Sequence, residues 1–278
     1  EPYRRQRQMC IRDRCGCSET DQVQESDEML ITFDMQHPAL ARATTSAFEK
    51  QDQIGVYMTG HGIPLEVAGN FLNNELLTFD GTKWNPARKL YWDEGSFDVF
   101  AYYPYIPSLS GVDDLPFSVA LDQSATSTDS GLDGYEASDF LWATDQNVTA
   151  SDSPVSLSFK HRMSKMVVRL MKGKDYDGDI PEDAEVYIHN TVPSATIDLS
   201  VGIVTRNTHG TAQTIKAKKV DKTQYTAIVV PQRLTNQVPL VEVVMKGVSY
   251  MVESKFVFKP GIQHMLSVTI SKNPEPVS

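Results

Sequence analysis

The sequence has no cysteine after Cys17, because all three of its cysteines lie between residues 10 and 17. A disulfide framework and a paired-cysteine redox site are therefore excluded for the body of the protein. A metal site at Cys15 and Cys17 is not expected, since a tetrahedral site needs four ligands and the nearest histidine is His37. No run of 18 or more apolar residues is present, so no transmembrane helix is expected.

Positive charge is scarce outside the first fourteen residues, which hold five arginines. The rest of the chain carries 21 basic and 34 acidic side chains. Such a balance repels phosphate backbones, which argues against nucleic acid as a partner. The catalytic signatures GxSxG, HExxH, GxGxxG and the P-loop are missing as well. We therefore expect a protein that is not an enzyme and that uses no cofactor and no metal.

The N-terminal residues divide into two unusual segments. Met9 to Arg14 back-translates into the end of a sequencing-library adapter, so residues 1–16 are interpreted as a leader remnant with adapter-derived sequence. An independent genomic clone with the same codons in frame would contradict this. Cys17 follows small residues and precedes a serine, which is typical of a bacterial lipobox, so it is the predicted lipidation site; the alternative is a free cysteine in a tail. Residues 17–28 are acidic and form a predicted tether.

A period-two pattern starts at residue 29. Met29, Ile31, Phe33 and Met35 share one face of a predicted half-buried strand. Further short runs rich in Val, Ile, Tyr and Phe alternate with turn sequences. Only a weak helix is expected, near residues 44–50 or 64–71. The pattern predicts an all-β protein built from β-sandwiches.

The long strand from Val155 to Leu170 changes phase. Apolar residues occupy odd positions up to Met163 and even positions from Met166 onward. A bulge, or a strand that crosses from one sandwich to another, would explain the change. We place a domain boundary there, which gives an N-terminal sandwich at 29–162 and a C-terminal sandwich at 163–278.

Two groups of side chains could carry chemistry. His161 lies on the apolar face of its strand, where a hydrogen-bonded interior histidine is expected more than a base or a ligand. Seven aromatic residues could form a sugar-stacking platform or belong to the core, as aromatics on strands usually do. They are Trp84, Tyr91, Trp92, Tyr102, Tyr103, Tyr105 and Trp142.

Several segments together resemble the fimbrillin family of Bacteroidales, the Mfa-like pilins of type V fimbriae. They are ARATTSAFEKQDQIGVYM (41–58), FDVFAYYPY (97–105), SDFLWA (138–143), VSLSFKHRMSKMVVRL (155–170), YTAIVVPQ (225–232) and FVFKPGIQHMLSVTISK (256–272). The resemblance implies two transthyretin-like antiparallel β-sandwich domains in tandem and export as a lipoprotein. It also implies a place in fimbriae on the outer membrane surface, with the membrane contacted only through the lipid anchor.

The resemblance further implies proteolytic processing between Arg42 and Ala43. Cleavage there would release the strand with Met29, Ile31, Phe33 and Met35, and the open groove would bind a strand from another fimbrial subunit. Toward the C-terminus, three alternatives stay open: an accessory or tip subunit that only receives a strand, a truncated chain, or donation of the 265–271 strand. The competing hypothesis is a monomeric surface lipoprotein that binds glycans, and a host or bacterial surface ligand fits either one.

Overall fold

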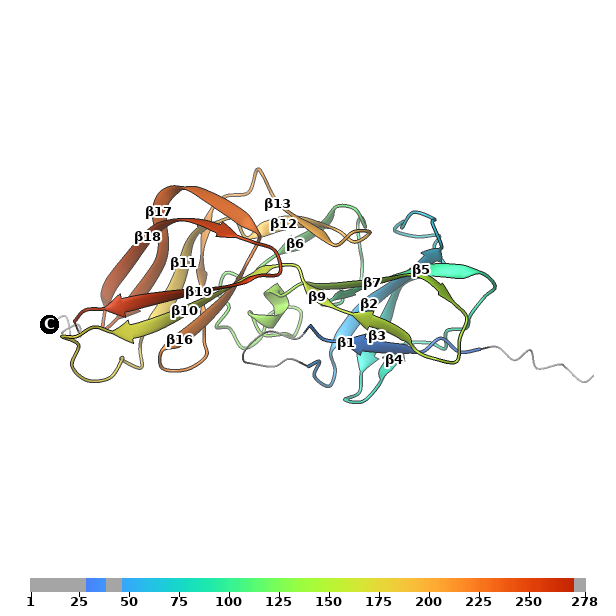
Figure 1. Cartoon of the computed structure of the whole chain (residues 1–278), viewed down its shortest axis with the longest axis horizontal. Helices are drawn as coiled ribbons and strands as arrows, with labels where there is room; N and C mark the ends of the chain where they lie inside the picture. The colour runs from blue at the N-terminus through green and yellow to red at the C-terminus, as the bar shows by residue number, and fades with distance from the viewer. Residues whose placement is uncertain (1–28, 39–46, 273–278) are drawn as a thin grey trace, which may run out of the picture.

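The computed structural model describes residues 29–38 and 47–272, and this part of the chain is almost entirely β-structure (Figure 1). Its one helical element is a short 3-10 helix, η1 (Glu136–Ser138). No helix among the described residues is long and apolar enough to cross a membrane. The predicted all-β class is confirmed. The tandem arrangement and the boundary at 162/163 stay predictions.

The N-terminal half is built around a six-stranded antiparallel sheet. Its spatial order is β4 (Trp84–Pro86), β3 (Leu72–Phe79), β2 (Gln53–Gly60), β5 (Ser96–Tyr103), β7 (Leu141–Thr149) and β9 (Lys160–His161). A separate two-stranded parallel sheet consists of β1 (Phe33–Gln36) and β8 (Val155–Ser158). β2 and β5 bury both faces, because alternate side chains enter two different hydrophobic clusters.

The C-terminal half contains two four-stranded sheets and one smaller sheet. The first has the order β15 (Lys218–Lys219), β16 (Gln224–Val229), β10 (Ser164–Lys172) and β19 (Gln263–Ile270). The second has the order β14 (Gln213–Lys216), β11 (Glu185–Thr191), β17 (Gln232–Met245) and β18 (Val248–Phe258). The three-stranded sheet consists of β13 (Ile203–Arg206), β12 (Ser194–Asp198) and β6 (Leu115–Ser118).

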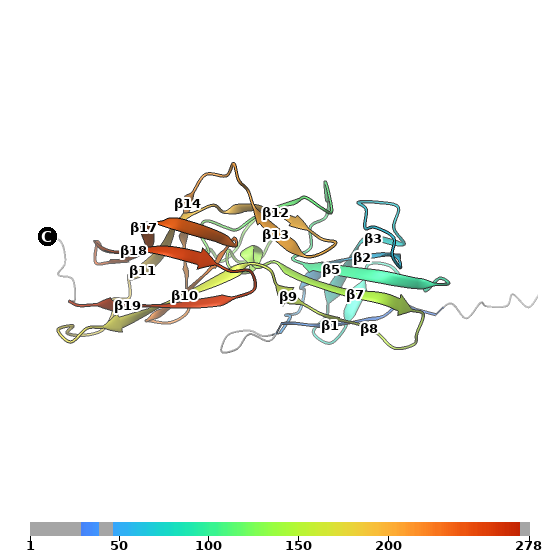
Figure 2. The same ribbon diagram turned by 45° about the horizontal axis from the view of Figure 1, so that its top comes forward.

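The long run from Val155 to Leu170, for which a bulge or a crossing was expected, is divided into three strands. β8, β9 and β10 follow one another along the length of the molecule and pair in three different sheets (Figures 1 and 2). Phe159 packs in the cluster around β1, whereas Met163 and Met166 both pack in the larger cluster, to which both halves of the chain contribute. The chain therefore passes from one hydrophobic cluster to the other between Phe159 and Met163, just before the phase change.

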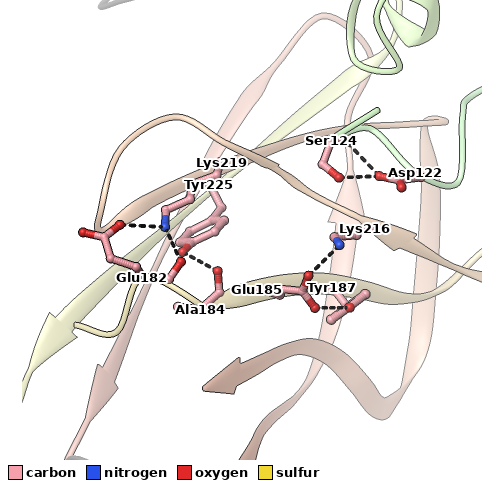
Figure 3. A network of polar contacts seen from close by, with 9 residues as sticks. All are labelled: Asp122, Ser124, Glu182, Ala184, Glu185, Tyr187, Lys216, Lys219 and Tyr225. Carbon is pink, nitrogen blue, oxygen red and sulfur yellow. Dashed lines mark hydrogen bonds and ion pairs between the residues drawn. The ribbon is translucent and has the colours of Figure 1, made fainter. Parts of the chain in front are cut away.

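A loop from the N-terminal half is fastened to the C-terminal strands (Figure 3). The backbone of Asp122 forms an isolated parallel β-bridge with the backbone of Lys216. The side-chain ammonium group of Lys216 lies 2.6 Å from the carboxylate of Glu185. Tyr187 donates a hydrogen bond to the same carboxylate, and the Tyr225 hydroxyl donates to the carbonyl of Ala184. The contacts of Asp122 with Lys216, of Lys216 with Glu185 and of Tyr225 with Ala184 each join segments that lie far apart in the sequence.

The weak helix was expected near residues 44–50 or 64–71. It is absent at 64–71, because the side chain of Asn70 binds the backbone N–H and carbonyl of Glu66 in place of helical partners. The other position falls partly outside the described residues, which exclude 44–46. The strand β3 has an irregular backbone, because Asn74 has a φ of 46° and the register shifts beside it. Leu72 and Leu77 are consequently buried out of phase, and no period-two pattern is visible.

The carboxylate of Asp98 stabilises the fold to a degree that depends on pH. It is 6% exposed and accepts hydrogen bonds from His61, the Gly62 N–H and the Asn147 N–H. Burial by itself would raise the pKa of Asp98, but these hydrogen bonds outweigh it and lower the pKa below its ordinary value. Because the unfolded state then binds the proton more tightly, this stabilisation is complete above the unfolded pKa of about 3.9 and is lost as the pH falls below it.

We expect Asp98→Asn to lower the free energy of unfolding by about 1–3 kcal/mol at pH 6. The difference from the native protein should shrink as the pH falls toward about 3. Urea unfolding at several pH values measures it, with Asp113→Asn at an exposed aspartate as the control. A difference that stays constant with pH would contradict the assignment.

Candidate functional site

The first extended segment, residues 29–36, lies in a groove formed by two distant segments, the chain around Tyr91 and β8. This groove is called the bed of β1. Its early residues pair with the chain around Tyr91: the Ile31 N–H donates to the Leu90 carbonyl at 2.8 Å, and the Trp92 N–H donates to the Met29 carbonyl at 2.9 Å. From Phe33 onward it runs parallel to β8. The strand therefore changes partner halfway along its length.

Side chains of this strand enter the hydrophobic cluster of the N-terminal half. Ile31 is 3% exposed, and Phe33 and Met35 are each 7% exposed. Met29 is 37% exposed, so the bed holds three of the four apolar side chains expected to share it. The reason is that β8 begins opposite Phe33, and no strand of the two-stranded sheet reaches back to Met29.

The geometry makes β1 a separable element. β8 has β1 as its only partner in their two-stranded sheet, among the described residues. The Val155 N–H donates to the Thr32 carbonyl, and the Phe159 N–H donates to the Gln36 carbonyl. Without β1, these two N–H groups lose their acceptors and the apolar bed is open. The arrangement can bind one extended strand that presents an apolar side chain at every second position.

The C-terminal end of the strand reaches a cavity of about 370 Å³. His37 lines it and lies 5.9 Å from the ring of His161, centroid to centroid. Nδ1 of His161 is 2.9 Å from the carboxylate of Asp139, so the hydrogen-bonded histidine expected from the sequence is confirmed. Burial, together with the neighbouring His161, lowers the pKa of His37.

The walls of this cavity come from both halves of the chain. Phe48, Tyr103 and Tyr135 supply aromatic surface, and Lys218 reaches it from β15. Asp52 also lines it, and burial raises the pKa of its carboxyl group. The cavity thus combines aromatic and polar groups, which is the usual lining of a small-ligand site.

A sugar-stacking platform and the core were the two alternatives for seven aromatic residues, and four of the seven belong to the core. Trp84, Trp142, Tyr102 and Tyr103 are buried, so their faces pack against neighbouring side chains. The indole N–H of Trp142 donates to the carbonyl of Leu199 at 2.7 Å, which ties β7 to the segment after β12. These aromatics serve the core.

Three predicted site residues lie outside the described residues: Cys17, Arg42 and Ala43. Lipidation and processing at these positions stay predictions. The Leu90–Trp92 segment, which pairs with the start of the first strand, was not predicted from the sequence. Its only signal is the short apolar run LYW between charged residues, and that run shows no periodicity.

Similar structures share this fold. A candidate cell adhesion protein from Bacteroides uniformis is 20% identical, with a TM-score of 0.68 over 89% of this chain and 94% of its own. One from Bacteroides ovatus is 20% identical, with a TM-score of 0.66 over 88% and 92%. A fimbrial protein from Bacteroides ovatus is 17% identical, with a TM-score of 0.56 over 89% of this chain and 51% of its own.

A search of curated proteins found no match. The sequence profile described as fimbrillin-like, in contrast, matches residues 41–278. This range covers most of the chain, including the described strands from β2 to β19. The protein therefore belongs to the fimbrillin-like family.

Proposed function

We propose that this protein is a surface fimbrial subunit that contributes to adhesion and is assembled by strand exchange. It is exported as a lipoprotein anchored through Cys17, and cleavage between Arg42 and Ala43 separates β1 from the rest of the chain. The observation that carries the proposal is the burial of Ile31, Phe33 and Met35 in the bed of β1. In the sequence, Arg42 lies between this segment and β2.

Energetics support an exchange over a simple loss of the strand. Full burial of each large apolar side chain contributes roughly 1.5–3 kcal/mol, so an empty bed would cost the subunit several kcal/mol. A replacement strand with the same alternation recovers this burial and also restores acceptors for the N–H groups of Val155 and Phe159. The burial that one subunit loses when its own strand leaves is regained when it binds the strand of another subunit.

The receiving role fits this chain better than the donating role. β19 is paired with β10 over Lys165 to Lys172 and buries Val268 and Ile270. Its release would uncover the edge of β10 and part of the C-terminal core. We therefore propose an accessory or tip subunit that accepts a strand from another fimbrial subunit.

A monomeric lipoprotein that binds surface glycans is the second candidate. The cavity lined by Phe48, Tyr103 and Tyr135 favours it, because aromatic and carboxylate groups together suit a sugar ring. The names of the structural neighbours as adhesion and fimbrial proteins support the first candidate. The fate of the cleaved protein distinguishes the two, since a glycan-binding protein would lose its anchor and gain no affinity for a strand.

Cleavage provides the test. The purified precursor is treated with a trypsin-like protease, and intact mass should show a chain that starts at Ala43. Arg42→Ala should block this product, whereas Arg206→Ala, at an exposed arginine on β13, should not. A chain that starts at an acylated Cys17 and resists cleavage at Arg42 would contradict the proposal.

Strand binding is measured on the cleaved protein with a synthetic peptide of residues 29–37, labelled for fluorescence anisotropy. We expect the peptide to bind only after cleavage and removal of the original segment. A control peptide with aspartate in place of Ile31 and Phe33 should not bind, because its carboxylates would be buried without partners. Equal binding of both peptides would argue against an apolar acceptor bed.

A further inference from the structure

The strand β18 lies at one edge of the second four-stranded sheet. It is 11 residues long, and its one strand partner in the described part of the chain is β17. The irregularities of that ladder lie in β17, where extra residues are inserted between Leu234 and Val238 and between Pro239 and Val241. β18 itself stays regular, with strictly alternating burial. A long regular edge is a template for another strand.

The hairpin before β18 determines which of its residues point outward. Lys246 and Gly247 form a two-residue turn with φ values of 49° and 76°, as in a type I′ hairpin. Met245 and Val248 therefore exchange hydrogen bonds across the turn. It follows that even-numbered residues of β18 direct their N–H and carbonyl groups to β17. Odd-numbered residues direct theirs to the free edge.

The side chains of β18 alternate in the same way. Even-numbered residues, including Tyr250, Val252 and Phe256, face the core. Odd-numbered residues face outward, and among them Met251 is 47% and Val257 is 36% exposed. Glu253 and Lys255 lie between these two apolar residues and are both exposed. The outward face thus reads apolar, acidic, basic, apolar.

This order is complementary to itself in one antiparallel register. When two copies of β18 pair with Ser254 at the twofold axis, Glu253 of each copy lies opposite Lys255 of the other. Met251 then lies opposite Val257 of the second copy, and Val252 opposite Phe256 of the second copy. The backbone groups of the odd-numbered residues also face the free edge. The register that pairs the charges therefore also allows the backbone hydrogen bonds between the two strands.

The neighbouring registers are unfavourable. Centring the pair on Glu253 places two carboxylates opposite each other, and centring it on Lys255 does the same with two ammonium groups. An axis between two residues would place an outward-pointing backbone opposite an inward-pointing one. Charge therefore favours the register centred on Ser254 over the registers centred on Glu253 and Lys255.

We propose that β18 is a homotypic interaction surface, through which two copies of this protein associate side by side by antiparallel strand pairing about Ser254. The pairing joins two four-stranded sheets into one continuous sheet across the dimer. It uses a different surface from the bed of β1 and does not depend on cleavage. A single pair of strands buries less than a standard interface, so we expect a dissociation constant on the order of 1–100 µM.

Charge reversal tests the partner and the register. Sedimentation of the full chain should show mass rising with concentration from 31.0 kDa toward twice that value. Glu253→Lys should weaken association by about tenfold or more, because two opposite-charge pairs become like-charge pairs. Glu253→Lys with Lys255→Glu should restore it. A native chain that stays monomeric throughout, or a dimer that Glu253→Lys leaves unchanged, would overturn the proposal.

A disulfide tests the geometry independently of charge. In a full chain with serine at Cys10, Cys15 and Cys17, Ser254→Cys should form an intermolecular disulfide on mild oxidation. Directly opposite Cβ atoms lie about 4.5–5.5 Å apart in such a pair. Glu253→Cys is the control, since the two copies of that position are diagonal neighbours about 7–8 Å apart. Faster cross-linking at position 253 than at 254 would rule out this register.

Discussion

Phe33→Ala should lower the free energy of unfolding of the uncleaved protein by about 3–5 kcal/mol. Phe33 is 7% exposed in the cluster between β1 and the six-stranded sheet. The surrounding side chains come from paired strands that cannot move into the space, so a cavity would remain. Urea unfolding of the purified precursor measures the loss.

Met29→Ala is the matched control on the same strand. Met29 is 37% exposed, so its truncation should change the free energy of unfolding by no more than about 0.5 kcal/mol. The same two substitutions in the 29–37 peptide should differ in their effect on its affinity for the cleaved protein. The Phe33→Ala peptide should bind at least about tenfold more weakly than the native peptide, and the Met29→Ala peptide should bind with nearly native affinity. Equal effects at both positions would contradict the geometry of the bed.

Gln123→Leu should lower the free energy of unfolding by about 2–5 kcal/mol. Gln123 is fully buried, and its amide completes the ladder of β16 beyond the end of β15. Its Oε1 accepts from the Ile228 N–H at 2.7 Å, and its Nε2 donates to the Ile228 carbonyl at 2.7 Å. Leucine has a similar size and leaves both backbone groups buried without partners, each at a cost of about 1–3 kcal/mol.

The control for this change is Gln213→Leu, at an exposed glutamine on β14. We expect it to alter stability by less than about 0.5 kcal/mol. Thermal or urea unfolding of the two variants beside the native protein makes the comparison. Similar stability of both variants would mean that the Gln123 amide can be replaced by packing alone, against the role assigned to it.

Local patterns in the sequence predicted the first strand correctly. Alternation at Ile31, Phe33 and Met35 predicted a half-buried strand, and all three side chains are buried. Met29 follows the same alternation yet is exposed. Alternation assigns a side chain to a face of its strand, whereas burial depends on whether another strand extends that far. The local pattern could not contain that information.

The predicted processing site shows a different limit. Cleavage between Arg42 and Ala43 was predicted through the resemblance of the surrounding segment, and an arginine in isolation has no comparable signal. The fimbrillin-like family assignment over 41–278 supports that resemblance. Whether a protease reaches the bond is a matter of chain accessibility, which the cleavage experiment measures directly.

The sequence by itself determined the all-β class and the faces of most strands, because side chains alternate with a period of two whatever their partners are. Only the tertiary structure decided which strands meet: Phe33 with Val155, β6 with β12, and the Gln123 side chain with Ile228. It also decided that β18 lies at the edge of its sheet, with β17 as its one strand partner among the described residues. Such pairings join residues far apart in the chain, so they depend on how whole sheets bury their apolar faces together, and no short segment encodes them.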